Sequence, residues 1–72
     1  AEDARYLRQL LERLDESKRV IVILTELEGM TSKEIAALLG LKQGTVDSRL
    51  RSARQELLRM VERDQTRWGG DR

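Results

Sequence analysis

Residues 26–57 read ELEGMTSKEIAALLGLKQGTVDSRLRSARQEL, and they are the most informative part of the chain because they hold two helical patterns separated by a glycine. Thr31 and Glu34 form a T-x-x-E capping box, in which each side chain satisfies the backbone N–H of the other residue. The helix that follows is short and stops at Gly40. A second helix is predicted to begin near Gln43.

The apolar residues of the two helices recur at helical spacing. They are Ile35, Ala36, Leu38 and Leu39 in the first helix and Val46, Leu50, Ala53 and Leu57 in the second. A helix-turn-helix needs a small residue between its helices, a turn residue that tolerates positive φ and an apolar anchor on the second helix. Ala36, Gly40 and Val46 meet these demands in that order. The spacing favours a DNA-binding helix-turn-helix over a plain helical corner, the other structure it allows.

Two further helices are predicted upstream. The first carries a leucine stripe at i, i+3, i+4 and i+7, formed by Leu7, Leu10, Leu11 and Leu14. Asp15 is a cap for the second, which ends at Gly29. Residues 20–24 of this helix read VIVIL, and local propensity alone favours a strand there. We interpret the run as helix, because a lone strand has no partner and a nearly apolar helix suits the centre of a small bundle.

The chain is therefore predicted to be all-α, a compact four-helix domain whose third and fourth helices form the helix-turn-helix. The domain is expected to span residues 1–64, with the last helix ending near Asp64. Residues 65–72 contain Gly69 and Gly70 and are expected to form a flexible tail, where Trp68 either folds back on the first helix or is exposed.

Composition excludes most catalytic chemistry. The 72 residues contain no Cys and no His, which removes disulfides, thiolate nucleophiles, imidazole bases and nearly all transition-metal sites. The carboxylates fall on caps or exposed faces, and no phosphate-binding loop is present, so we expect no enzyme and no cofactor. No apolar run approaches membrane-spanning length and the start is not that of a signal peptide, so a soluble cytoplasmic protein is expected.

Charge is unevenly distributed along the chain. Residues 1–41 hold six basic and eight acidic side chains, a balance of −2, whereas residues 42–72 hold eight basic and five acidic ones, a balance of +3. The C-terminal half is therefore the better candidate for contact with nucleic acid.

Residues 26–57 closely resemble region 4 of extracytoplasmic-function sigma factors. The motifs that carry the resemblance are the ELEGMT opening, EIA at residues 34–36 and GTVDSRLRSAR at residues 44–54. With a looser match upstream, the resemblance covers about residues 7–60. It implies that the last helix binds the upstream (minus-35) promoter element, that the N-terminal helices bind the RNA polymerase β flap, and that an anti-sigma factor often masks these surfaces. The implied polymerase contacts are Tyr6, Leu10 and Arg13.

Three residues depart from the family pattern. Asp15 stands where many relatives have proline, which leaves the helix cap intact. Asp47 stands where Lys or Arg is usual, and Ser52 stands where some relatives place a base-reading Arg. The usual DNA target of the family is therefore not carried over to this chain.

Helical geometry places the candidate DNA contacts. At 100° per residue, Gly44, Ser48, Arg51 and Gln55 lie opposite the core stripe, with Asp47 and Ser52 flanking them. Gln43 suits an adenine edge, Arg51 a guanine edge and Asp47 a cytosine amino group. Phosphate contacts are expected from Lys33, Lys42, Thr45, Arg49 and Arg54.

Several alternatives remain open. Asp47 either reads a base, pairs with Arg51 or balances the helix N-terminus. Arg49 either contacts phosphate or pairs with Glu28 or Glu34. The set Arg59, Arg63 and Arg67 is interpreted as a solvated surface.

Two rival functions differ from promoter binding. One is an interaction module that binds polymerase or an anti-sigma factor, with DNA binding weakened by Asp47. The other is the DNA-binding domain of a response regulator. Sigma region 2, which melts promoters, is absent from these residues, so the sequence is expected to be either an excised domain or a stand-alone regulator.

Overall fold

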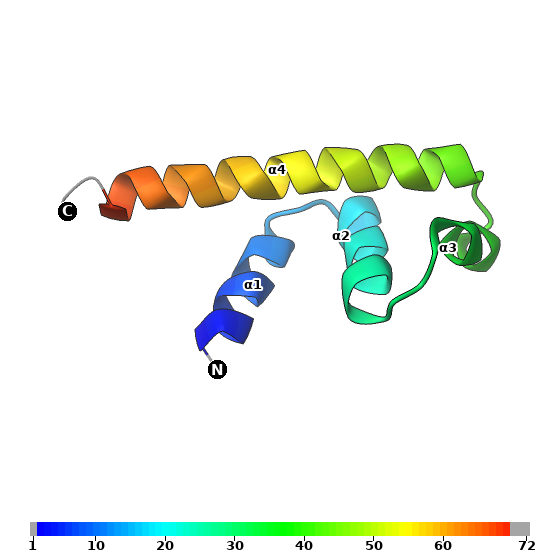
Figure 1. Cartoon of the computed structure of the whole chain (residues 1–72), viewed down its shortest axis with the longest axis horizontal. Helices are drawn as coiled ribbons and strands as arrows, with labels where there is room; N and C mark the ends of the chain where they lie inside the picture. The colour runs from blue at the N-terminus through cyan, green and yellow to red at the C-terminus, as the bar shows by residue number, and fades with distance from the viewer. Residues whose placement is uncertain (1, 70–72) are drawn as a thin grey trace.

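The computed structural model describes the backbone of residues 2–69 and the side chains of residues 4–65. The elements in chain order are α1 (Glu2–Glu12), α2 (Glu16–Val22), the π-helix η1 (Ile23–Leu27), α3 (Ser32–Leu39) and α4 (Gln43–Gly69). No strand occurs within residues 2–69. The prediction of an all-α domain with four helices is confirmed, because η1 directly continues α2 (Figure 1).

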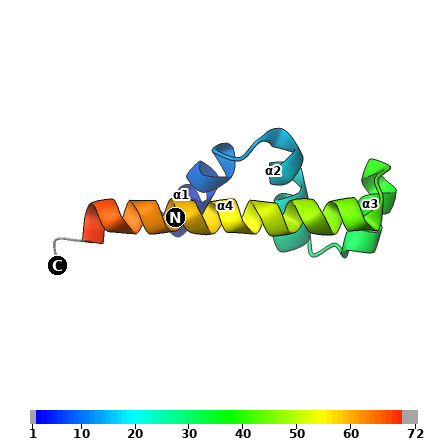
Figure 2. The same cartoon turned by 90° about the horizontal axis from the view of Figure 1, so that it is seen from above.

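Helix α4 is the long helix against which the other helices pack. Its 27 residues form the longest element, about 40 Å at 1.5 Å per residue. The other helices pack along one side of α4, with α1 toward its C-terminal half and α3 at its N-terminal end (Figure 1). The view from above shows that α4 runs straight past all of them (Figure 2). The N-terminal end of α4 and its C-terminal half therefore lie next to different helices (Figure 1).

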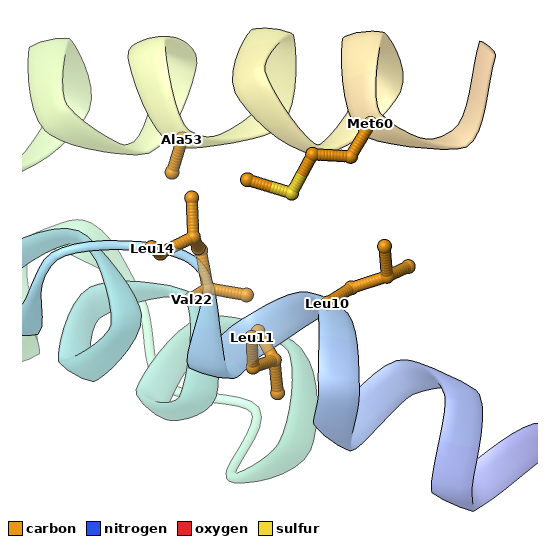
Figure 3. Close-up of a cluster of buried hydrophobic side chains, with 6 residues drawn as sticks. All are labelled: Leu10, Leu11, Leu14, Val22, Ala53 and Met60. Carbon is orange, nitrogen blue, oxygen red and sulfur yellow. The ribbon is translucent and has the colours of Figure 1, made fainter. Parts of the chain in front are cut away.

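Two apolar clusters form the core along α4. The first joins α1, the turn after it and α2 to the middle of α4 and consists of Leu10, Leu11, Leu14, Val22, Ala53 and Met60 (Figure 3). The second joins α2, α3 and the start of α4 and consists of Ile21, Ile35, Ala36 and Val46. Leu50 packs against both clusters and links them. The second cluster is the one that holds the helix-turn-helix in place.

The β-branched run at residues 20–24 is helical, as predicted. Ile21 and Val22 are buried in the two different clusters, which explains why this helix is apolar on more than one side. The sequence pattern did not predict the change from α-helix to π-helix at Ile23. Within η1 the hydroxyl oxygen of Thr25 is buried without a hydrogen-bond partner among the residues described, so tertiary packing overrides a local polar requirement there.

The caps predicted for α2 and α3 and the glycine predicted after α2 are confirmed. Asp15 caps α2 by accepting a hydrogen bond from the Lys18 N–H at 3.0 Å, which lowers the pKa of the Asp15 carboxyl. The capping box of Thr31 and Glu34 is complete. Gly29 adopts a φ of +69°, a conformation that glycine reaches without steric cost.

Some apolar positions differ from the predicted core. Leu38 is 62% exposed and Leu39 is 38% exposed, because α3 buries only the arc that contains Ile35 and Ala36. Leu7 is also exposed on α1. Conversely, Met60 is buried although no stripe had included it. A short helix packed on one side has room for few core positions, and its other leucines face outward.

Helix α4 continues to Gly69, beyond its predicted end near Asp64. Residues 65–68 read QTRW and contain no helix breaker, so the helix extends until the first glycine. The side chains of Arg67 and Trp68 lie outside the described residues, as do residues 70–72 of the predicted tail. In residues 2–69 no helix is both long enough and apolar enough to cross a membrane.

Candidate nucleic-acid interface

The turn between α3 and α4 has the geometry of a helix-turn-helix. Ala36 is buried between the helices, and Gly40 adopts a φ of +69°. The chain then reverses through Leu41, whose N–H donates to the Ala36 carbonyl at 2.9 Å. Val46, fully buried, anchors the first turn of α4. The three demands identified in the sequence are therefore met, and the start of α4 is fixed against α3.

The N-terminus of α4 carries no side-chain cap. The Lys42 carbonyl accepts the first hydrogen bonds of the helix, from the N–H groups of Thr45 at 3.0 Å and Val46 at 3.2 Å. Lysine has no acceptor atom in its side chain, and among the described residues no side chain accepts from the N–H of Gln43 or Gly44. Helices α2 and α3 both have such caps. The first N–H groups of α4 are consequently available to an external acceptor.

Gly44 lies in open space at this N-terminus. A Cβ added there would meet no atom within 4 Å, and its φ is not among the positive values found at Gly29 and Gly40. Neither packing nor backbone conformation therefore requires glycine at position 44. The lack of a side chain leaves the helix N-terminus open to close approach.

The face of α4 that points away from the core is exposed, as predicted. Of the predicted DNA-contact residues, those exposed are Lys33, Lys42, Gln43, Gly44, Asp47, Ser48, Arg51 and Arg54. Thr45, Arg49 and Ser52 are half-buried at the border of the core. The structure brings all of them onto one end of the molecule, because all lie on α4, on the preceding turn or, for Lys33, on α3.

The alternative ion pairs proposed for this face are not formed. Among the described side chains, no salt bridge joins Asp47 to Arg51, and none joins Arg49 to Glu28 or Glu34. Asp47 and Arg51 nevertheless line the same surface hollow. Its lining residues are Asp47, Leu50, Arg51, Arg54, Gln55 and Leu58. Leu58 is 59% exposed there. The hollow thus combines one carboxylate, two guanidinium groups and apolar surface.

Arg54 forms an ion pair that the sequence did not predict. Its Nη2 donates to Oε2 of Glu26 in η1 at 2.6 Å. The two residues are 28 positions apart, and no local pattern indicates that they meet. A second pair, Lys18 with Glu56, joins α2 to α4 and is more buried.

A different polar cluster lies at the other end of α4. The Tyr6 hydroxyl donates to Oδ2 of Asp64 at 2.8 Å, and Nη1 of Arg13 lies 3.4 Å from the same oxygen. The hydrogen bond to Asp64 raises the pKa of the Tyr6 hydroxyl. Arg13 and Asp64 also line a hollow with Met60 and Arg63. Asp64 was missed in the sequence, because its link to Tyr6 spans 58 positions.

Leu10 is not on the rim with Tyr6 and Arg13, where it was expected. It is only 6% exposed and packs in the first core cluster beside Met60 (Figure 3). The placement of Leu10 at an accessible partner-binding surface was therefore wrong, because the register of α1 against α4 turns this leucine inward. Arg59 and Arg63 are exposed, in agreement with a solvated helix surface.

The described residues contain no group of three or more His, Cys, Asp or Glu side chains placed to hold a metal ion. Neither surface hollow contains a nucleophile with an adjacent base. What this face offers chemically is a set of hydrogen-bond donors, guanidinium groups and one carboxylate on a rigid helix. These are the groups that read base edges and hold phosphates.

Comparison with known proteins gives one family and several relatives. The family model described as Sigma-70, region 4 matches residues 4–57. The ECF RNA polymerase sigma factor SigE of Mycolicibacterium smegmatis is 43% identical over 51 residues, which cover 71% of this chain and 20% of SigE. The RNA polymerase sigma factor NccH of Alcaligenes xylosoxydans xylosoxydans is 39% identical over 59 residues, covering 82% of this chain and 32% of NccH. The sigma factor CnrH of Cupriavidus metallidurans is 37% identical over 54 residues, covering 75% of this chain and 28% of CnrH. The chain thus spans about a fifth to a third of the length of these relatives.

Proposed function

Because this chain belongs to the Sigma-70 region 4 family, a non-enzymatic DNA-binding domain, we propose that it binds duplex promoter DNA through α3 and α4. Region 4 binds the minus-35 promoter element in RNA polymerase sigma factors. The proposal for this chain is sequence-specific binding at such an element, with the N-terminal half of α4 in the major groove. It acts there as part of transcription initiation, in the cytoplasm.

The observation that carries the proposal is the open N-terminus of α4. Its first N–H groups have no side-chain cap within the described part of the chain, and Gly44 places no side chain over them. Phosphate is the ligand that suits such a helix end, since the N–H groups and the helix dipole both favour an anion. A fold that needed this helix only for packing would gain stability from a capping residue at position 42.

The exposed face next to this terminus supplies the base-reading groups. Asp47, Ser48 and Arg51 stand away from the core on a helix held by the buried Val46. Since Asp47 has no salt bridge to Arg51 among the described residues, its carboxylate is available to accept from a cytosine amino group. Arg51 would read a guanine edge, and Lys33, Lys42 and Arg54 would contact phosphate.

A selection of bound duplexes from a random-sequence pool tests the proposal directly, because it detects binding and reads the site together. The salt dependence of affinity for the selected duplex then tests the phosphate contacts. With about four phosphates neutralised, log K should fall with log salt with a slope near −3.6, at ~0.9 per contact. Recovery of no preferred sequence, or an affinity independent of salt, would contradict promoter binding by this surface.

A second candidate function is contact with the RNA polymerase β flap through the end of the molecule opposite the helix-turn-helix. The observation that favours it is the cluster of Tyr6 and Arg13 on Asp64, where Tyr6 is 40% exposed and Leu7 is exposed beside it. Leu10, buried in the core, has no part in this contact. An anti-sigma factor that covers either surface would block the corresponding function.

Variants at this end separate the two functions. Arg13→Glu and Tyr6→Ala should weaken binding to the isolated flap and leave DNA affinity unchanged, because the cluster lies far along α4 from Gly44. Arg51→Ala is the matched variant at the DNA face. It should weaken DNA binding and leave binding to the flap unchanged. Loss of DNA binding with retention of flap binding in the first two variants would show that the two surfaces were assigned the wrong way round.

A further inference from the structure

The ion pair between Arg54 and Glu26 lies at the edge of the proposed DNA surface. Arg54 lines the same hollow as Asp47 and Arg51, on the exposed side of α4. Glu26 reaches it from η1, the continuation of α2. The Nη2 to Oε2 distance is 2.6 Å, and the side chains remain 59% and 51% exposed. The guanidinium that would meet a phosphate is therefore already bound by a carboxylate that is open to solvent.

The fold itself does not account for this ion pair. Exposed pairs contribute little to stability, because solvent screens the charges and two long side chains lose freedom. The pair of Lys18 and Glu56 differs in this respect, since it is more buried between α2 and α4 and suits a structural role. Breaking the ion pair between Arg54 and Glu26 therefore costs little free energy, and another anion can replace the Glu26 carboxylate at Arg54.

The position of Glu26 is set by a rigid element. It lies within η1, which is closed by hydrogen bonds from the Glu28 N–H to the Ile23 carbonyl at 3.1 Å and from the Met30 N–H to the Leu24 carbonyl at 3.0 Å. The carboxylate is therefore presented to α4 by ordered backbone and not by a loose loop.

We propose that Glu26 is a built-in competitor for the DNA phosphate at Arg54 and so sets the strength and salt dependence of DNA binding. A carboxylate and a phosphodiester oxygen use the same donors of a guanidinium group. To contact phosphate, Arg54 must leave Glu26, and the Glu26 charge then stands unpaired near the DNA backbone. The inference rests on the proposed DNA-binding function and deepens it by naming an internal residue that regulates the site.

Removal of the Glu26 carboxylate should therefore increase the affinity of the chain for duplex DNA. Glu26→Gln keeps the size of the side chain but frees Arg54, so affinity for duplex DNA should rise about two- to fivefold at low salt, the range expected for an exposed ion pair. Because Glu26 holds Arg54 away from phosphate in part of the complexes, its removal should make the slope of log K against log salt steeper by up to ~0.9, the contribution of one neutralised phosphate. Thermal stability should change little.

A double-mutant cycle with a charge control tests this. The full 72-residue chain, Glu26→Gln, Arg54→Gln and the double variant are titrated against the selected duplex at several salt concentrations. Glu28→Gln is the matched control: Glu28 is exposed in the same segment, and no salt bridge to it occurs among the described residues. We expect the gain from Glu26→Gln to exceed that from Glu28→Gln and to disappear when Arg54 is already replaced.

Each other result overturns the inference. If Glu26→Gln and Glu28→Gln increase DNA affinity equally, the increase is a general effect of charge. The same holds if Glu26→Gln still increases DNA affinity when Arg54 is replaced. A loss of affinity in Glu26→Gln would show that Glu26 orients Arg54 for DNA. If the unaltered chain binds no duplex at all, the proposed function fails and the competitor role fails with it, a result distinct from normal binding without coupling.

Discussion

Replacement of Gly44 by alanine should raise the stability of the fold and lower its affinity for DNA. The position is helical, its φ is not in the positive range, and an added Cβ meets no atom within 4 Å. Alanine restricts the unfolded chain more than glycine does, and nothing in the folded chain opposes it. The same methyl group would stand over the uncapped N–H groups of α4, where we place a DNA phosphate.

The magnitudes of the two effects differ. A compatible Gly→Ala replacement stabilises by about 0.4–1 kcal/mol, which corresponds to a rise in Tm of roughly 2–8 °C for a domain of this size. Loss of one hydrogen bond from the backbone to a charged phosphate costs about 1.5–3 kcal/mol of binding free energy. DNA affinity should therefore fall roughly 10- to 150-fold.

Thermal unfolding followed by circular dichroism measures the first effect, and titration with fluorescently labelled duplex measures the second. Gly40→Ala is the matched control, because that site also has open space within 4 Å but has a φ of +69°. Alanine at position 40 should destabilise the fold by ~1–2 kcal/mol, the cost of a left-handed residue with a Cβ. The two variants together separate steric space from backbone conformation.

A lower Tm in Gly44→Ala would show that the fold does not accommodate a Cβ at this position. A higher Tm with unchanged DNA affinity and salt slope would show that Gly44 lies outside the interface. Only the combination of higher stability and weaker binding supports a glycine kept for DNA contact.

Two further predictions concern carboxylates. Asp64→Ala should return the ionisation of Tyr6, the single tyrosine, toward the ordinary pKa of ~10, because the hydrogen bond to Asp64 raises the pKa of Tyr6 in the folded chain. The stabilisation from this bond is complete below the unfolded pKa of Tyr6 and is lost as pH rises through the folded pKa; an unchanged midpoint in an absorbance titration of tyrosinate would contradict the link. Asp47→Ala should relax preference at one base pair by ~1–3 kcal/mol while general affinity holds or rises, measured against all four bases at each position. A uniform gain without altered preference would show that Asp47 only weakens DNA binding, and would favour the interaction-module alternative.

Local sequence was sufficient for the caps of α2 and α3 and for the turn between α3 and α4, but not for the end of α4. Asp15, Thr31 with Glu34, Gly29 and Gly40 each act within a few residues of their own position, through a side-chain cap or a left-handed φ. Such effects depend on neighbours in the chain and on little else, so the four helices and the helix-turn-helix follow from the sequence alone. The exposed face of α4 followed in the same way from its helical period.

Sequence patterns did not predict which residues of different helices contact one another. Leu10 was expected at a partner surface but is part of the first core cluster, while Leu38, one of four apolar residues at helical spacing in α3, is exposed. Helical period specifies that a face is apolar; the register and rotation of one helix against another decide which of its residues reach the core.

The same reason explains the two polar links that no sequence pattern indicated. Arg54 pairs with Glu26 across 28 positions, and Tyr6 bonds to Asp64 across 58 positions. Local patterns were enough to predict an all-helical chain with a helix-turn-helix and an exposed basic face. The contacts that modulate that face and join α1 to the far end of α4 were decided only when the helices packed, because a bond across helices requires both partners at one point in space.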